Sequence, residues 1–529
     1  MGGEQRQLVD TAATRWGADI HADVAEGADS LCRIECPPRL LPEICGWLFS
    51  DLDYSFGGII VEQQRQWELR YVFYGDRAAG WVHVLTHSPA SQEQLPSITS
   101  AVHAADWHER EAEDLFGLVF EGHPRLGDFV LHNDTWQEAI NPMRKSFDAH
   151  KPVARRQPDQ NWRPRQIVHE EGAFVMPIGP IHSTATGPVH FLLETVGEDV
   201  IRAQPRLFYA YRGLEKIAES RSAHDTILLA ERMSATSAFA HSLALCQAVE
   251  SVCRVEVPAR AQALRVFLAE LERLRQHVAA IEGICESTAF AVATSQAAIL
   301  EEDLLRLSGA LTRHRYLFGL NVFGGLSIDL EDTVCREAAA KAQHVATQLD
   351  DLERMLSVSS SFLDRLEEVG NVSADDARAF GLVGPVARAS GAALDLRKAH
   401  PYSGYDRLAF EVPYESEGDG YARLRLFFRE AQQSVSILQA VGNGLPGGRV
   451  RVPEARFRSG AALGWVEAPR GAALHWIRLR DDGSVERYRM ITPSFANWHG
   501  FRLGAENFAF QDFPIILATF ALSVPENDR

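Results

Sequence analysis

Alternating apolar and polar residues mark short strands in the first part of this chain. Residues 30–36 alternate in this way. Three further segments rich in β-branched and aromatic residues follow at 59–64, 67–74 and 81–87. The short, turn-like connections between these three segments predict antiparallel pairing. Residues 38–52 instead repeat their apolar positions with helical spacing. Strands and a helix mixed in this way predict an α+β domain.

The middle of the chain has the apolar spacing of long helices. A helix is predicted to begin at Pro258, because the apolar residues after it recur every three or four positions. Similar patterns cover 224–253, 288–313, 335–367 and 421–443. Helices of this length predict a bundle. A strand pattern then returns at 462–467, 473–480 and 484–491. Asp482-Gly483 is typical of a hairpin turn between the last two.

A proline-rich and basic segment separates the two patterns. Residues 150–166 hold three prolines and five lysines or arginines with little apolar content, as an extended linker does. The sequence therefore predicts a domain over 1–150, a linker over 151–166 and a second domain over 167–529.

Charge and cysteine usage narrow the class of protein. A net charge of −18 argues against nucleic acid as the main partner and against charge-driven binding to an anionic membrane. No apolar run has membrane-spanning length, and residues 1–17 lack the apolar centre of a signal peptide. The seven scattered cysteines suit reduced thiols. We therefore expect a cytoplasmic protein, held at a membrane, if at all, by other chains.

A short charged segment stands out near the end of the first domain. Asp106 and Glu109 have the spacing of a capping box, and Gly117 suits the position after a helix. Arg110 and Asp114 are spaced to pair across one helical turn. The run 107–117, Trp-His-Glu-Arg-Glu-Ala-Glu-Asp-Leu-Phe-Gly, together with Phe-Glu-Gly-His-Pro at 120–124, resembles the small hydrophilic subunit of complex I.

Blocks of sequence throughout the second domain carry a further resemblance. They include Gly-Pro-Ile-His at 179–182, the run 206–221, Gly384-Pro385, Glu-Ala-Pro-Arg-Gly at 467–471 and Pro-Ser-Phe-Ala-Asn-Trp at 493–498. This domain resembles the quinone-site subunit of complex I and, more closely, the large subunit of formate-hydrogenlyase-type, group-four [NiFe] hydrogenases. The resemblance implies a mainly α-helical hydrogenase-like domain with peripheral strands, following an α+β complex I-like domain.

The resemblance breaks where those hydrogenases hold their metal. The first Cys-x-x-Cys pair of the family falls on Ser234 and Ser237. The second pair should follow 512–523, but residues 524–529 contain no cysteine. A nickel–iron pair needs soft thiolate ligands, and serine hydroxyls stay protonated and hard. We therefore expect no [NiFe] centre, no hydrogen turnover and no directly bound metal.

A quinone site is the alternative that the resemblance implies for this pocket. The complex I relatives place a headgroup-binding tyrosine in the loop that corresponds to 233–237. Here that loop offers Ser234, Ala235, Thr236 and Ser237 and has no tyrosine. His182 stays in register, and it either hydrogen-bonds a quinone and supplies a proton or only satisfies loop backbone. His241 beside the loop either lines the cavity or packs in the core.

Two carboxylates and an arginine are further candidates. Glu215 and Glu219 lie four residues apart. The hydrogenase-like interpretation implies a proton relay or a contact with ion-pumping subunits, whereas the simpler interpretation is a salt-bridged helix surface. Arg470 is expected to hold a loop through backbone hydrogen bonds.

Three functional hypotheses follow from the resemblance. The first is a peripheral-arm subunit at the cytoplasmic face of the cell membrane, docked on an iron–sulfur subunit and on antiporter-like membrane subunits, that passes electrons to a quinone-like acceptor. In the second, the cavity is redox-inert and the chain has a structural role, in which it links conformational change to ion translocation. The third is a quinone-binding subunit of NADH-quinone oxidoreductase type.

Overall fold

The computed structural model describes residues 2–25, 31–76, 80–137, 140–151, 153, 166–169, 171–181, 187–452 and 456–529. Most of the predicted linker lies outside these ranges, so the proposed domain boundaries stay predictions. Within the described residues, no helix combines the length and the apolar content that a membrane span requires.

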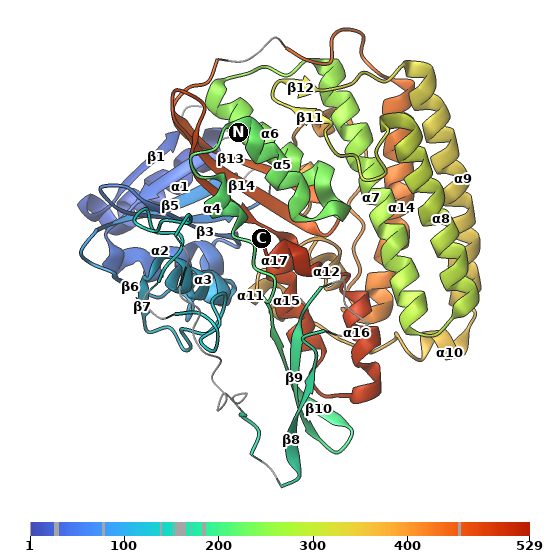
Figure 1. The fold of residues 1–529 in the computed structure, drawn as a ribbon, viewed down its shortest axis with the longest axis horizontal. Coiled ribbons are helices and arrows are strands. Elements are labelled where there is room, and N and C mark those ends of the chain that lie inside the picture. Colours follow the sequence, from blue (N-terminus) through green and yellow to red (C-terminus); the bar gives the residue numbers. More distant parts are fainter. Residues whose placement is uncertain are drawn as a thin grey trace.

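A five-stranded sheet organises the first part of the chain (Figure 1). Its order is β1 (His21–Ala25), β2 (Leu31–Glu35), β5 (Trp81–Pro89), β4 (Gln66–Tyr74) and β3 (Ser55–Gln63). The predicted antiparallel pairing of the last three strands is confirmed, while β2 joins β5 in parallel. The helices beside it are α1 (Gly2–Trp16), α2 (Leu41–Gly46) and α3 (Asp106–Phe116). A small pair of strands, β6 (Gln94–Pro96) and β7 (Val119–Glu121), completes this part.

Helix α3 forms as predicted, but two of its expected contacts are wrong. Gly117 ends the helix with φ 74°, where a side chain would be strained. Glu109 does not cap the helix start: it is buried and accepts hydrogen bonds from Ser97 Oγ (2.5 Å), Ile98 N (2.8 Å) and Thr99 Oγ1 (2.9 Å). Asp114 bonds the backbone of residues 129–131 instead of Arg110. In both cases a carboxylate removed wholly or partly from water takes donors from a neighbouring loop, because it needs them there.

Long helices form a bundle in the second part, as the apolar spacing predicts (Figure 1). They are α7 (Ala259–Ser287), α8 (Ala291–Thr312), α9 (Asp332–Ser357) and α14 (Gly420–Asn443). The pattern over 224–253 is divided into α5 (Ala223–Met233) and α6 (Ala238–Cys253) by a break at residues 234–237. Shorter helices connect the bundle: α4 (Leu214–Ala218), α10 (Ser360–Leu363), α11 (Ala374–Ala379), α12 (Gly384–Ala389) and α13 (Leu396–Ala399).

Three further sheets accompany the bundle in the described ranges. Strands β13 (Gly460–Ala468), β14 (Gly471–Leu479) and β15 (Val485–Ile491) form an antiparallel sheet. Strands β8 (Ala173–Ile178), β9 (His190–Val196), β10 (Asp199–Arg206) and β16 (Phe508–Ala509) form a second sheet, and β11 (Asn321–Val322) with β12 (Gly325–Leu326) a third. The last helices are α15 (Pro493–Gly504), α16 (Phe513–Thr519) and α17 (Val524–Asn527).

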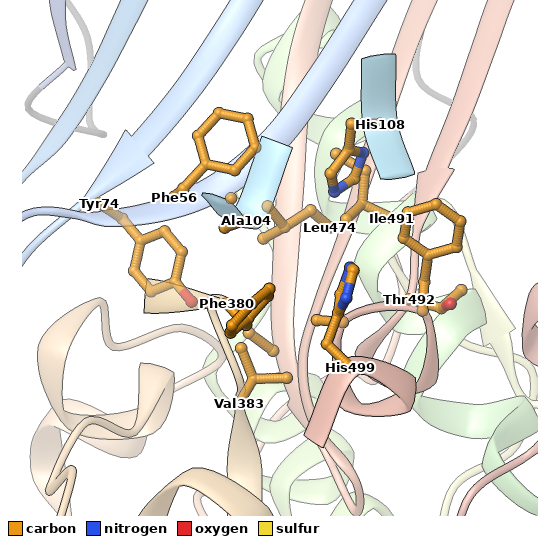
Figure 2. Close-up of a pocket in the computed structure, with 15 residues that line it drawn as sticks. Phe56, Tyr74, Ala104, His108, Phe380, Val383, Leu474, Ile491, Thr492 and His499 are labelled. Carbon is orange, nitrogen blue, oxygen red and sulfur yellow. The ribbon is translucent and has the colours of Figure 1, made fainter. Parts of the chain in front are cut away.

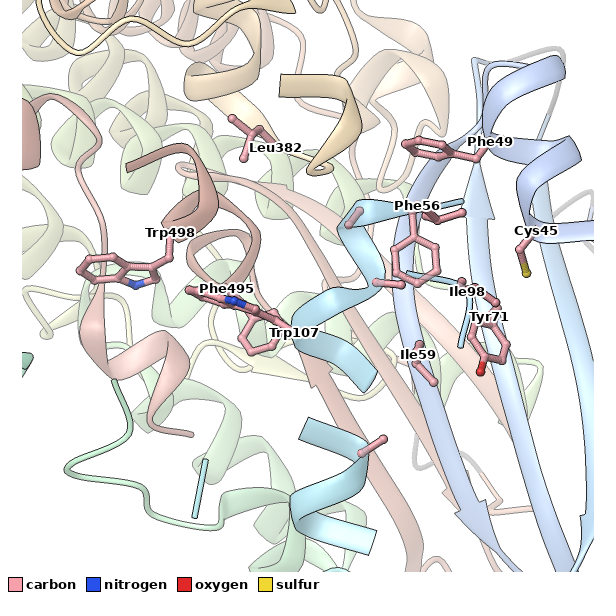
Figure 3. Packing of buried hydrophobic residues seen from close by; sticks show 14 of the residues in the cluster. Cys45, Phe49, Phe56, Ile59, Tyr71, Ile98, Trp107, Leu382, Phe495 and Trp498 are labelled. Atoms are coloured by element: carbon pink, nitrogen blue, oxygen red, sulfur yellow. The ribbon is translucent and has the colours of Figure 1, made fainter. Parts of the chain in front are cut away.

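The two parts share one hydrophobic core. Figure 3 shows Trp107 of α3 beside Phe495 of α15, and their ring centroids lie 5.7 Å apart. A side chain at Gly58 of β3 would meet Ile491 of β15 at 2.7 Å, so these two strands are in direct contact. The sheet of the first part is therefore packed against the C-terminal strands, which places α3 next to the elements that build the site below.

Candidate functional site

The break between α5 and α6 presents two serines to the protein interior. Ser222 caps the start of α5, since its Oγ accepts from Asp225 N at 3.1 Å. At the other end, Ser234 has extended backbone with φ −141° and ψ 109°, which stops the helix. Ser237 directly precedes α6, and both serines are buried.

A distant segment meets this break and supplies a matching pair of oxygen side chains. Ser523 Oγ lies 3.4 Å from Ser234 Oγ. Ser237 Oγ donates to Glu526 Oε1 over 3.5 Å. Ser523 and Glu526 are separated by two residues, as are Ser234 and Ser237, so two pairs with equal spacing face each other.

Arg470 places a cation between the two pairs. It lies at the turn between β13 and β14, and its Nη1 donates to Ser237 Oγ (3.1 Å) and to Glu526 Oε1 (3.2 Å). Its Nε donates to the Ala521 carbonyl at 2.6 Å. The expected backbone bond is therefore present, together with an ion pair that the sequence did not reveal. We call Ser234, Ser237, Arg470, Ser523 and Glu526 the Arg470–Glu526 cluster.

Two glycines allow the turn that carries Arg470 to approach α12. A Cβ at Gly384 would lie 2.2 Å from the Arg470 carbonyl oxygen, and Gly384 has φ 66°. A Cβ at Gly471, with φ 132°, would lie 2.7 Å from Gly384 N. Neither position has room for a side chain. The two glycines therefore allow the close backbone contact between α12 and the turn, and this contact positions the Arg470 guanidinium.

Glu526 is a fully buried, ionised carboxylate. Its Oε2 accepts from Ser494 Oγ at 2.5 Å, and its exposed fraction is 0%. Burial by itself raises the pKa of this carboxyl, but the Arg470 cation and the hydrogen bonds outweigh burial and lower the pKa to about 2. The cluster therefore holds a permanent charge pair at neutral pH.

A chain of side chains begins 3.9 Å from Glu526 and continues through hydrogen bonds from His241 onward. His241 of α6 is fully buried, with Nε2 3.9 Å from Glu526 Oε1 and Nδ1 3.0 Å from His475 Nε2. His475 Nδ1 is 2.6 Å from the Tyr488 hydroxyl. Burial, together with His241 and Arg529, holds the pKa of His475 well below its ordinary value. A neutral imidazole has one donor and one acceptor nitrogen, so His475 can pass a proton between its two neighbours.

The remaining predicted pocket residues have different surroundings. Thr236 Oγ1 accepts from Arg470 Nη1 at 3.2 Å, so Thr236 touches the cluster. Ala235 is exposed. His182 lies outside the described residues. The structure thus brings four of the six predicted pocket residues together: Ser234, Thr236, Ser237 and His241.

Glu215 is an interior residue and not part of a helix surface. Its exposed fraction is 3%, and its Oε1 accepts from Arg489 Nη1 (3.3 Å), Arg529 Nε (3.1 Å) and Met490 N (2.8 Å). Both arginines also contact Glu111 of α3. We call Glu111, Glu215, Arg489 and Arg529 the interface ion cluster, because it joins α3 to the second part of the chain. The surface interpretation is wrong for Glu215.

Glu219 has a separate set of partners nearer the surface. It pairs with Lys145 (2.9 Å), Lys216 (3.0 Å) and Arg487 (2.7 Å). These cations lower the pKa of Glu219 against the opposing effect of burial. Glu215 and Glu219 therefore do not act on one another as a pair, although four residues separate them.

A third buried charge network explains motifs to which the sequence assigned no role. Arg388 pairs with Glu430 (2.9 Å) and Glu467 (2.8 Å), and Arg397 pairs with Asp395 (2.7 Å) and Glu270 (3.0 Å). All of these side chains are buried. The network connects α7, α12, α13 and α14 to β13, the strand before Arg470, so its role is to position that strand.

A small cavity lies where the first part of the chain meets α15. Figure 2 shows Phe56, Tyr74, His108 and His499 around it. Its volume is about 20 Å³, enough for about one water molecule. Burial, with Arg502, lowers the pKa of His499 to about 3, and burial, with Arg489, holds the pKa of His108 well below its usual value. Both imidazoles are therefore neutral, and the cavity is too small for an organic ligand.

The sequence missed the second half of the site. Ser494, Ser523 and Glu526 were not candidates, and neither were His475 and Tyr488. Ser523 and Glu526 have the same spacing in the sequence as Ser234 and Ser237, and this shared spacing was the signal that could have revealed the second pair. We did not recognise this spacing because the family has a pair of cysteines in this part of the chain.

Three known families match successive parts of the chain. Residues 34–153 match the family described as respiratory-chain NADH dehydrogenase, 30 Kd subunit. Residues 212–280 match nickel-dependent hydrogenase, and residues 287–461 match respiratory-chain NADH dehydrogenase, 49 Kd subunit.

Individual relatives cover most of the chain. Formate hydrogenlyase subunit 5 of Escherichia coli K12 is 32% identical over 490 residues, which are 90% of this chain and 85% of that protein. Hydrogenase-4 component G of the same organism is 29% identical over 490 residues, 91% of this chain and 85% of that protein. The C/D subunit of NADH-quinone oxidoreductase from Bdellovibrio bacteriovorus is 31% identical over 429 residues, 78% of this chain and 75% of that protein. The predicted resemblance and fold class are confirmed.

Proposed function

The chain belongs to the family of fused complex I 30-kDa/49-kDa-like subunits that includes formate hydrogenlyase subunit 5, and from this premise we propose a coupling role for it. It acts as a peripheral-arm subunit of a membrane-associated oxidoreductase of complex I or hydrogenase type, at the cytoplasmic face. The Arg470–Glu526 cluster transmits charge or proton movement in that assembly and does not turn over hydrogen.

The donor set of the cluster does not fit a nickel–iron centre. Such a centre needs four thiolates, two of which bridge the metals. The four side chains that meet here are the hydroxyls of Ser234, Ser237 and Ser523 and the carboxylate of Glu526. The guanidinium of Arg470 lies within 3.2 Å of Ser237 and Glu526 and would repel a cation. This charge pair is the single observation that carries the proposal.

The same contacts favour coupling over redox chemistry in this pocket. The two pairs of oxygen side chains are already within 3.5 Å of each other, so they leave no room for a ligand between them. Glu526 stays ionised at neutral pH, so the proton that moves in the coupling step is one on the neighbouring histidines, and the fixed Arg470–Glu526 pair responds to its position. The His241–His475–Tyr488 chain supplies a route for that proton.

Purification of the assembly through a tag on this chain tests the proposal. Mass spectrometry is expected to identify an iron–sulfur subunit and antiporter-like membrane subunits, and elemental analysis to find nickel far below one atom per chain. Glu526→Gln alone leaves Arg470 without its carboxylate, so the variant expected to assemble with the same partners is the double variant Arg470→Met/Glu526→Gln, which has no unpaired buried charge. In proteoliposomes it should lose ion translocation while keeping electron transfer within about twofold. Stoichiometric nickel, or hydrogen evolution that depends on this chain, would refute the proposal.

A quinone-binding role is the second candidate, and similarity to the C/D subunit of NADH-quinone oxidoreductase favours it. His182 would then hydrogen-bond a quinone carbonyl beside the loop 233–237, as the family resemblance implies. The His182→Ala assembly would lose reduction of a quinone analogue, whereas Arg470→Met/Glu526→Gln would keep it. Unchanged reduction in His182→Ala would leave only the coupling role.

A further inference from the structure

We propose that an arginine-lined cleft between α3, β10 and α15 is a binding site for a phosphate group. The cleft has a volume of about 310 Å³, the space of about ten water molecules. Five arginines and two aspartates line it. The arginines are Arg110 of α3, Arg125, Arg202 and Arg206 of β10, and Arg502 of α15. Such a concentration of positive charge is unusual in a chain whose net charge is −18.

The two aspartates of the cleft are already engaged. Asp128 pairs with Arg206 at 3.1 Å, and Asp134 outside the cleft also pairs with Arg206, at 2.7 Å. Asp106 pairs with His123 at 3.2 Å. These carboxylates make their ion pairs with Arg206 and a histidine, and they reach the arginines of α3 and α15 only through attraction over a longer distance.

Three of the arginines have unused donors. In the part of the chain that the structure describes, no carboxylate lies within 4.0 Å of Arg110, Arg202 or Arg502, and the Nε of each is buried without an acceptor. Arg110, with an exposed fraction of 5%, has only long bonds to the carbonyls of Gly127 (3.2 Å) and Asp128 (3.4 Å). Buried donors without acceptors are costly, which indicates that an acceptor is supplied from outside.

The electrostatics of the cleft agree with this interpretation. Burial and the neighbouring Arg125 lower the pKa of Arg110 to about 10. Burial lowers the pKa of Arg502 as well; Asp106 and Glu506 oppose this effect, and Arg202 and Arg125 add to it. These arginines repel one another, so an anion between them would gain interaction with several charges at once. A phosphate fits best, because its oxygens accept from the forked donors of guanidinium groups in pairs and carry more than one charge.

The cleft lies between the two parts of the chain, so a ligand bound there could regulate how they pack together. Its walls come from both parts of the chain: Trp107 and Phe129 on one side, Leu192 and Leu207 on the other. It is separate from the Arg470–Glu526 cluster, so the inference does not depend on the proposed coupling role. A bound phosphate would bridge α3 to β10 and α15 and stabilise their contact.

Titration calorimetry on the purified full chain tests the site. Inorganic phosphate and pyrophosphate are titrated at constant ionic strength, and vesicles of phosphatidylglycerol or phosphatidylcholine are tested by co-sedimentation. We expect saturable binding of pyrophosphate or of phosphatidylglycerol vesicles, weakened at least tenfold in Arg202→Gln/Arg502→Gln. Arg65→Gln, which removes the same charge from an exposed turn, should bind as the native chain does.

Thermal unfolding separates a binding site from a structural cluster. Without ligand, the double variant should melt no lower than the native chain, because repulsion is relieved. Pyrophosphate should raise the melting temperature of the native chain only. The proposal fails if neither phosphate probe binds, or if the double variant binds as well as Arg65→Gln. It also fails if the double variant loses a partner subunit from the assembly and shows no other change. The cleft would then bind a carboxylate of that subunit and not a phosphate.

Discussion

Arg470 and Glu526 form a buried ion pair in which each charge compensates the other. A buried ion pair contributes little net stability compared with a well-packed apolar pair, since both charges lose their hydration. Removing one partner is different, because it leaves the other charge buried and uncompensated. This asymmetry allows the pair to be tested by single and double substitution.

The first prediction concerns loss of the cation. Arg470→Met should lower the free energy of unfolding by about 3–5 kcal/mol, because ionised Glu526 loses its partner. The double variant Arg470→Met/Glu526→Gln should recover most of this loss, since no buried charge remains. Denaturant unfolding of both variants measures the difference. Equal stability of the single variant and the native chain would show that the pair is not buried as described.

The second prediction concerns pH. The pKa of Glu526 is about 2 in the folded chain and close to 4.5 when it is unfolded. The unfolded state therefore takes up a proton first as the pH falls. The stability difference between the native chain and Arg470→Met/Glu526→Gln should stay constant above about pH 5 and shift against the native chain from about pH 4.5 towards pH 2. Unfolding curves across this range measure it, and a pH-independent difference would contradict the lowered pKa.

At the scale of elements, the position of α6 on the C-terminal sheet decides where the loop 234–237 lies. A Cβ at Gly464 of β13 would lie 2.0 Å from the Ala244 carbonyl oxygen and 2.7 Å from Ala248 N, both backbone atoms of α6. Helix and strand therefore touch without a side chain between them. Because Ser237 directly precedes α6 and Arg470 follows β13, this contact determines how closely Arg470 approaches Ser237.

The third prediction tests that contact. Gly464→Ala should destabilise the chain by about 2–3 kcal/mol or more, because backbone atoms of α6 must move. Gly283→Ala in α7 is the matched control: nothing lies within 4 Å of the new Cβ, and a helical alanine should stabilise by up to about 1 kcal/mol. Melting temperatures of the two variants should shift in opposite directions. A shift of the same sign in both would contradict the close approach of α6 and β13.

At the scale of the whole molecule, the interface ion cluster connects the first part of the chain to the second. Glu111 belongs to α3, Glu215 to α4 and Arg489 to β15. Burial opposes ionisation of Glu111, but Arg489 and Arg529 outweigh it and lower its pKa to about 2. The cluster therefore has two negative and two positive charges in balance, and loss of any one leaves a net charge at the interface.

The fourth prediction tests this interface. Glu111→Gln should lower the free energy of unfolding at neutral pH by about 3–5 kcal/mol, because two buried arginines then share one carboxylate. Glu113→Gln on the same helix is the control. Glu113 accepts one backbone hydrogen bond, from Gly127 N, and is only half-buried, so its loss should cost about 1 kcal/mol. Similar losses in the two variants would mean that the interface cluster does not hold the parts together.

Sequence alone determined the fold class, most helices and strands, and the family, because apolar periodicity and long motifs are local properties of the chain. It also located one half of the site, Ser234 and Ser237. Only the tertiary structure decided the other half, since Ser523, Glu526 and Arg470 are brought to the serines by the packing of β13, α12 and α17. The break between α5 and α6 likewise has no local signal. It is held from α7, where Glu272 accepts from Phe239 N (2.8 Å) and Ala240 N (3.0 Å) and Arg275 donates to the Thr236 carbonyl. Contacts between residues so distant in the chain depend on how elements pack, and no local pattern records that.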